Sequence, residues 1–358
     1  MPAPPAPADL GRTIVSWTVE PLQGWHLPLL DDPSFLTLQS QLQRSVLLAL
    51  PERLLSAVLP RRSLAPECLI ALDRACADRP LPLGLVVCQR SNRSGSCWLI
   101  QHLRVADAIA AASLSRHDVA ASLLKEALHQ NSGAASWITR VASHNGFLLA
   151  VLREQGFQPL RNDRVWRWQH SPTGPGSPPP TLPADLQLRP LHRRTAPLLW
   201  HLEQAASPAH LRQLLDRRVE DVLDQSDRHG WLLIDANRNQ AVAGVRRLAS
   251  HPDSGHEVEF TLHPGWQHLL GSATEVLLRR MAADQPLWLR FEVGDPQRER
   301  WLRELAAEPQ GEEVLMARSV WRRQEGHPAR RAGVRIEAVL ERLQPRQRPI
   351  PTPLGPRG

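Results

Sequence analysis

Two stretches of the chain show the same succession of apolar and polar patterns. In the second stretch, short apolar runs bounded by turn residues predict strands, and apolar residues at helical spacing predict helices. The strands are expected over 186–189, 231–235, 241–248, 257–263, 287–293 and 314–322, and the helices over 211–223, 271–282 and 297–305. The order is strand, helix region, three-stranded meander, helix, strand, helix, strand.

The first stretch gives the same order. Strands are expected over 13–19, 69–72, 83–89, 97–105, 136–141 and 157–168, and helices within 34–59 and over 115–129 and 145–155. The class is mixed α/β (α+β), with antiparallel hairpins early and a crossover helix late in each unit. The last strand of each unit is expected to complete the sheet of its own unit.

Short motifs recur in the same order in both stretches. Pro190-Leu191 repeats Pro21-Leu22, and Val320-Trp321-Arg322 repeats Val165-Trp166-Arg167. Between them, a Ser-Gly pair at 254–255 repeats the pair at 94–95. A repeat of this length indicates a duplicated domain, since solenoid repeats have periods of about 20 to 50 residues.

The predicted domain boundaries follow the composition. Residues 12–169 and 185–324 form the two domains, which agrees with two domains for 358 residues. Residues 170–184, rich in Pro, Gly and Ser, form a semi-rigid linker. Residues 1–11 are expected to be disordered. Residues 325–358 are an Arg/Pro-rich tail with one short helix at 333–343.

Composition excludes several classes of protein. No apolar run reaches the roughly 18 residues of a membrane helix, and residues 1–9 lack a signal-peptide pattern, so a cytoplasmic protein is expected. The four cysteines form no CxxC pair, which argues against a metal site and favours buried, reduced thiols.

The net charge of +7 is concentrated at one end of the chain. Residues 327–358 contain seven Arg and two Glu, which leaves the rest of the chain close to neutral. A nucleic-acid partner is therefore expected only weakly, through the tail.

Two segments resemble the GNAT superfamily of acyl-CoA N-acyltransferases. Ser143–Phe157 is similar to the family's late segment, with Asn145 before a helix and Gly156-Phe157 after it. Val258–Leu278 is similar to its strand, Pro-x-Trp turn and acyl-CoA-binding helix. The resemblance implies two tandem GNAT-like domains, acetyl-CoA or another acyl-CoA as cosubstrate, and an amine acceptor of unknown identity.

The resemblance also implies where the cosubstrate binds. The family holds the pyrophosphate at the N-terminus of the helix after the fourth strand, where free N–H groups and the helix dipole favour an anion. The matching residues in the second unit are Gln267 and Ser272, or, one residue later, His268, Gly271 and Ala273. In the first unit they are Arg116 and Ala121, together with Asn145. An ordinary helix start, with Ser115 as its N-cap, explains the same segment of the first unit.

Transfer to an amine requires a proton acceptor. Glu257 and Glu259 are the candidates, because residues two apart on a strand share a face and the family often has a Glu on this strand. The corresponding strand of the first unit carries His102 instead. The family's usual acid is a Tyr, and the chain contains none; Leu152 and Leu302 occupy the matching positions.

The sequence therefore favours a GNAT-type acyltransferase with base and cosubstrate site in the second unit. Two alternatives remain open: a non-catalytic GNAT-fold module for binding or scaffolding, and a nucleic-acid-associated protein acting through the tail.

Overall fold

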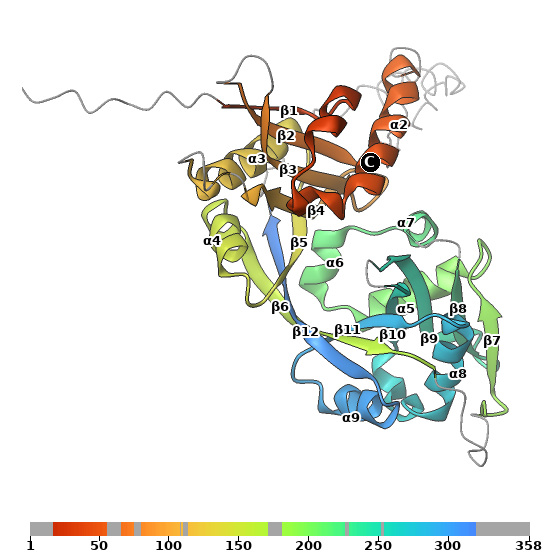
Figure 1. Ribbon diagram of the computed structural model, residues 1–358. Coiled ribbons are helices and arrows are strands. Elements are labelled where there is room, and N and C mark those ends of the chain that lie inside the picture. Colours follow the sequence, from red (N-terminus) through yellow and green to blue (C-terminus); the bar gives the residue numbers. More distant parts are fainter. Residues whose placement is uncertain are drawn as a thin grey trace, which may run out of the picture. The chain divides into compact units, whose positions relative to one another are not determined.

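A continuous mixed sheet runs through the described part of the chain (Figure 1). The structure is a computed structural model that describes residues 17–55, 66–74, 80–107, 109, 114–170, 181–225, 229–251 and 254–319. These residues belong to one compact unit. We call 17–170 the first half and 181–319 the second half. The predicted helix at 333–343, the basic tail and Cys76 lie outside the described residues.

The first half contains eleven elements within the described residues. They are β1 (Trp17–Pro21), η1 (Gly24–Leu29), α1 (Pro33–Leu36), α2 (Gln39–Leu55), β2 (Glu67–Asp73), β3 (Leu81–Arg90), β4 (Cys97–Val105), α3 (Arg116–Gln130), β5 (Ser136–Ala142), α4 (Gly146–Glu154) and β6 (Gln158–Trp168). All predicted elements of this half are present, and the helix region 34–59 divides into α1 and α2.

The second half repeats this order. Its elements are β7 (Leu186–Pro190), α5 (Ala196–Ala206), α6 (Ala209–Leu215), α7 (Val219–Asp224), β8 (Gly230–Asp235), β9 (Gln240–Ser250), β10 (His256–Leu262), η3 (Pro264–Leu269), α8 (Ser272–Ala282), β11 (Leu287–Glu292), α9 (Pro296–Glu304) and β12 (Glu308–Ser319). The predicted mixed α/β class, with two GNAT-like units, is confirmed. The helical region expected at 211–223 contains the two helices α6 and α7, separated at Asp216, which is left-handed with φ 42°.

The two halves exchange their last strands. The strand order is β1-β2-β3-β4-β5-β12-β6-β11-β10-β9-β8-β7. β12 lies antiparallel between β5 and β6, and β6 pairs with β11 on its other side. The expectation that each closing strand completes its own unit is wrong. The alternating pattern of a strand specifies which face is buried but does not specify which neighbour it pairs with.

The cores agree with this exchange. Trp166 and Trp168 of β6 pack into the core of the second half, and the indole N–H of Trp168 donates to the carbonyl of Leu305 at 3.1 Å. Met316 of β12 is fully buried in the core of the first half. Each half therefore depends on the other for apolar side chains as well as for backbone hydrogen bonds.

A second contact joins the β3–β4 hairpin to α6. The side-chain amide of Asn92 donates to the carbonyls of Leu215 and Asp216, at 2.9 and 3.2 Å. The hydroxyl of Ser96 donates to the Asp216 carboxylate at 2.6 Å. These bonds fix the first half against the second half at a point distant from the exchanged strands in the sequence.

Three of the predicted buried thiols are confirmed: Cys68, Cys88 and Cys97 are buried and not in disulfides. Burial raises the pKa of the Cys68 thiol to about 11. Within the described ranges, no helix is long and apolar enough to cross a membrane. No cluster of three or more His, Cys, Asp or Glu side chains that could hold a metal is found in the same residues.

Candidate functional site

The central strands of the first half diverge and leave an open edge. β4 and β5 pair in parallel only over Cys97–Ile100 and Ser136–Thr139. The hydroxyl of Thr139 donates to the carbonyl of Ile100 at 3.0 Å, at the last paired position. Beyond this point β4 continues to Val105 without a partner among the described strands on the β5 side. A strand edge without a pairing strand can bind an extended ligand that carries amides.

A β-bulge lies where the two strands diverge. Val87 of β3 pairs with His102, whereas the next residue, Cys88, pairs with Ile100, so Gln101 is the extra residue on β4. A bulge re-aims side chains and backbone groups, and bulges are common beside active sites. In the second half, the irregularity beside β10 lies on β9, where Leu248 is the residue skipped. The two halves therefore differ at the strand that would border a ligand.

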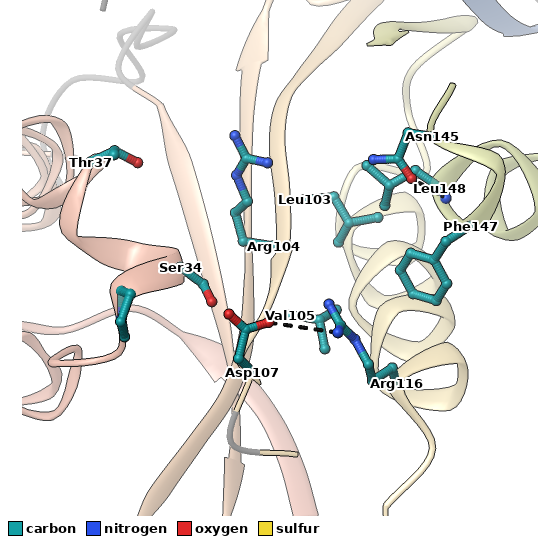
Figure 2. Close-up of a pocket in the computed structure, with 11 residues that line it drawn as sticks. Ser34, Thr37, Leu103, Arg104, Val105, Asp107, Arg116, Asn145, Phe147 and Leu148 are labelled. Atoms are coloured by element: carbon teal, nitrogen blue, oxygen red, sulfur yellow. Dashed lines mark hydrogen bonds and ion pairs between the residues drawn. The ribbon is translucent and has the colours of Figure 1, made fainter. Parts of the chain in front are cut away.

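A pocket of about 340 Å³ opens beside the free end of β4 (Figure 2). One of its ends is formed by the starts of α3 and α4, and the other end by α1. Its lining is Pro33, Ser34, Thr37, Leu103, Arg104, Val105, Asp107, Arg116, Asn145, Phe147 and Leu148. The volume is within the range of ligand pockets, about 300–1,000 Å³.

The structure brings two of the predicted residues of the first unit together in this pocket. Arg116 begins α3; its guanidinium lies 3.6 Å from the Asp107 carboxylate and over the ring of Phe147. Asn145 caps α4 by accepting a hydrogen bond from the N–H of Leu148 at 3.1 Å. The third, Ala121, packs against the core of the first half and does not line the pocket. Ser115 caps α3, so the ordinary helix start and the pocket coexist.

Arg104 is a pocket residue that the sequence analysis missed. It is exposed, and Figure 2 shows its guanidinium extending from β4 away from Asp107 and Arg116. No ion pair or hydrogen bond joins it to the other pocket residues drawn there. Arg104 lies two positions after His102, and both residues follow the bulge at Gln101. At this spacing, the two side chains lie on the same face of β4.

His102 lies at the end of a chain of side-chain hydrogen bonds. The amide of Gln41 donates to Gln101 at 2.8 Å, and the amide of Gln101 donates to Gln89 at 2.6 Å. The carbonyl oxygen of Gln41 is then the acceptor for Nε2–H of His102 at 3.1 Å. Because Nε2 carries the proton in the neutral ring, Nδ1 is the nitrogen that can accept a hydrogen bond. Burial and the charge of Arg104 lower the pKa of His102 to about 4, so the imidazole is neutral near pH 7.

The two glutamates predicted as bases are held by arginines. Glu259 forms ion pairs with Arg246 and, at 3.4 Å, with Arg217. Although burial acts to raise it, the charges of these arginines hold the pKa of Glu259 well below its usual range. Glu257 pairs with Arg290 at 3.2 Å, and Arg290 also pairs with Glu313 at 2.8 Å. Half-buried glutamates that pair with largely buried arginines favour a structural role, and the assignment of a base to Glu257 or Glu259 stays a prediction.

The predicted phosphate segment of the second half lies against the chain's own linker. Ser272 Oγ accepts a hydrogen bond from the N–H of Thr181 at 2.9 Å and donates to its carbonyl at 3.1 Å. Ala273 is buried in the core, and Gly271 caps α8 with φ 141°. Gln267 and His268 lie in η3, where His268 contacts the ring of Trp266. The structure does not bring these five residues to the pocket of the first half.

Aromatic rings bridge the corresponding divergence in the second half. β10 and β11 pair only at His256–Leu287 and Glu257–Trp288. Beyond these pairs, the rings of Phe260 and Phe291 lie 5.9 Å apart, and both contact Trp301 of α9. All three side chains are buried. The region that is open in the first half is packed in the second.

The architecture resembles that of solved proteins at low sequence identity. No protein-family model matches the sequence, and no curated protein matches it. A GCN5-related N-acetyltransferase from Sphaerobacter thermophilus matches with a TM-score of 0.50 at 12% identity, over 85% of this chain and 96% of that one. A candidate acetyltransferase from Pyrococcus horikoshii matches with a TM-score of 0.52 at 9% identity, over 87% of this chain and 92% of that one. The chain has the GNAT fold. The matched part is longer than either half, so the likeness extends across both.

A tandem GNAT protein from the clavulanic acid biosynthesis pathway also matches, with a TM-score of 0.49 and 14% identity, over 85% of this chain and 98% of that one. At these identities the likeness concerns the fold alone. The chemistry of this GNAT-fold chain has to be argued from its own pocket.

Proposed function

We propose that the protein is a GNAT-type N-acyltransferase whose acyl-CoA site is the pocket of the first half. The sequence pattern favoured the second half as the location of this site. One observation carries the proposal: Arg116 and Asn145 line a single pocket at the open edge of β4. The packed rings of Phe260, Phe291 and Trp301, and the Thr181–Ser272 contact, disfavour the equivalent position of the second half.

The residues of the pocket fit an acyl-CoA molecule part by part. The start of α3, with Arg116 beside it, suits an anionic pyrophosphate, since free N–H groups and a guanidinium both favour a negative charge. The unpaired side of β4 suits the two amides of the pantetheine arm. Leu103, Val105, Phe147 and Leu148 supply apolar contacts around them. The hydrogen bond from the N–H of Leu148 fixes the side chain of Asn145, which also lines the pocket.

His102 is the proposed proton acceptor. In the transfer, the amine nitrogen forms a bond to the acyl carbon, the carbon–sulfur bond breaks, and the amine loses one proton. The neutral imidazole of His102 accepts through Nδ1, because Gln41 holds the Nε2–H. An acid for the leaving thiolate is not essential, since a thiol with a pKa of about 8.5 leaves without one. This agrees with the absence of Tyr in the sequence.

The second half then has a structural role. It supplies β12 to the sheet beside β5, and its ion-pair cluster around Arg246 fixes α5 and β10 against β9. In this proposal Glu257 and Glu259 hold the second half together.

A non-catalytic module that binds acyl-CoA is the second candidate. Leu152, at the position of the family's acid, is buried at 2% exposure, so no polar group reaches the pocket from there. The fold and the pocket would be the same in both candidates, and only the chemistry distinguishes them.

The test is release of thiol from acetyl-CoA in the presence of a panel of small amines. The proposal predicts acceleration by at least one amine, and a drop of about 100-fold or more in kcat for His102→Gln, with acetyl-CoA affinity unchanged. The glutamine variant retains an N–H donor for Gln41, which limits the structural damage. Binding of acetyl-CoA without acceleration by any amine would establish the non-catalytic module instead. Absence of acetyl-CoA binding would contradict both.

A further inference from the structure

The α1 end of the pocket carries a positive charge without a compensating carboxylate among the lining residues. Arg104 projects from β4 into this end, where the other lining residues are Pro33, Ser34 and Thr37 of α1 and its C-terminal cap. These three residues carry no charge; the Ser34 hydroxyl donates to the carboxylate of Asp32, the N-cap of α1, at 2.6 Å, and Thr37 is exposed. The one carboxylate that lines the pocket, Asp107, is 3.6 Å from Arg116, and the Arg104 guanidinium extends away from it (Figure 2).

Two carboxylates near this end have other partners: Asp32 accepts hydrogen bonds from the N–H and the hydroxyl of Ser34, and Glu257, whose charge acts on His102, pairs with Arg290. His102, on the same face of β4, is neutral, and the charge of Arg104 is one of the causes of its lowered pKa. Gln41, near the start of α2, is engaged by His102 and Gln101. The α1 end therefore presents the Arg104 guanidinium and the Thr37 hydroxyl, and it favours an anionic ligand over a cationic one.

We propose that the acceptor is a small amine bearing a carboxylate, of the amino-acid class, and that Arg104 binds this carboxylate. The inference rests on the proposed function, because it takes the α3 end of the pocket as the place of acyl-CoA. A guanidinium matches a carboxylate with two parallel N–H donors. The hydroxyl of Thr37 lies at the same end as a further donor.

The spacing along β4 sets the size of the acceptor. Side chains two positions apart on a strand are separated by roughly 7 Å along it. A carboxylate held by Arg104 and an amine facing His102 must therefore be joined by a short linker. An amino acid meets this requirement, whereas a protein lysine side chain, whose amine is far from its own carboxyl group, does not.

Calorimetry with product mimics tests the inference without relying on turnover. Free CoA is first bound to the full-length protein, and common N-acetyl amino acids are then titrated in, each beside its C-terminal carboxamide. The expected result is that at least one acid binds, and binds about 10- to 100-fold more tightly than its amide, as a charge-assisted hydrogen bond would give. In Arg104→Gln the preference for the acid should disappear, and in Arg104→Lys part of it should remain.

Three results would overturn the proposal. They are failure of every acid to bind, equal binding of acid and amide to the native protein, and weaker binding of CoA itself by Arg104→Gln. The last result would assign Arg104 to the cosubstrate. Because CoA binding is measured first, failure of the proposed function is distinguished from failure of this inference. Arg104 is exposed, so an unchanged unfolding midpoint in both variants confirms that the fold is retained.

Discussion

Thr181 and Ser272 exchange two hydrogen bonds, so the end of the linker lies on the first turn of α8. The corresponding helix of the first half, α3, starts at Arg116 beside an open pocket. The sequence treats the two helix starts as alternatives for one role. The structure gives them different surroundings, so substitutions at the two helix starts should affect acetyl-CoA binding differently.

Replacing Arg116 by Gln is expected to weaken acetyl-CoA binding by roughly tenfold or more, because a charge-assisted contact to phosphate is lost. Ser272→Ala, in the second half, should leave the affinity unchanged. Calorimetry on both variants checks this. A loss in Ser272→Ala together with native affinity in Arg116→Gln would move the site to the second half.

Asn145 has two separable roles. Asn145→Ala removes the cap of α4 and should lower the free energy of unfolding by about 1 kcal/mol, measured by urea denaturation. Asn145→Asp should keep this stability, because Asp295 caps α9 in the same way by accepting from the N–H of Arg298. The aspartate should nevertheless weaken acetyl-CoA binding by placing a negative charge in the pocket. Equal affinity for native protein and Asn145→Asp would show that Asn145 does not face the ligand.

The ion pairs of Glu259 predict a dependence of stability on pH. Since the pKa of Glu259 is lowered in the folded state, the carboxylate stabilises the fold at neutral pH, and this contribution is lost as the pH falls below the ordinary carboxyl value of about 4.3. Glu259→Gln should cost roughly 1–3 kcal/mol at pH 7, because buried Arg246 loses a partner. Urea denaturation at pH 7 and near pH 3.5 should show a smaller difference in acid.

The same variant tests the base that the sequence favoured. If Glu259→Gln stays folded and binds acetyl-CoA, the present account predicts that it also retains acyl transfer. Loss of transfer with binding intact would place the base in the second half and contradict a structural role for Glu259.

The exchanged strands predict that the halves need each other. A chain divided between residues 171 and 180 should give two fragments that are unfolded or aggregated alone, because β5 and β6 both lose β12 and β6 loses β11. Co-expressed fragments should assemble and bind acetyl-CoA. Circular dichroism and co-purification check this result. A first fragment that folds and binds alone would show that the exchange is dispensable.

Much of the fold follows from local sequence. Apolar periodicity predicts the order of elements in both halves, and the Ser-Gly repeats do mark equivalent hairpins, where Gly95 and Gly255 both have positive φ. The exchange of β6 and β12 could not be predicted, because each strand buries the same side chains whichever neighbour it pairs with. Because the two units are similar, the sheet edge of either unit could accept either closing strand, and the sequence does not distinguish the two pairings.

The candidate site was predicted in part. Arg116 and Asn145 were found because family positions are set by local spacing. Arg104 was missed because its role depends on the bulge at Gln101 and on the approach of α1, and neither is encoded near it. The sequence favoured Glu257 and Glu259 over His102 because it shows the carboxylates but does not show Arg217, Arg246 and Arg290 folded against them.

Hydrogen–deuterium exchange with and without acetyl-CoA tests the central claim most directly, because it locates the site without altering the chain. The account predicts protection in peptides covering residues 101–107, 114–120 and 145–149, and none in peptides covering 264–274. Protection confined to 264–274, or no protection in the first half at saturating acetyl-CoA, would contradict it.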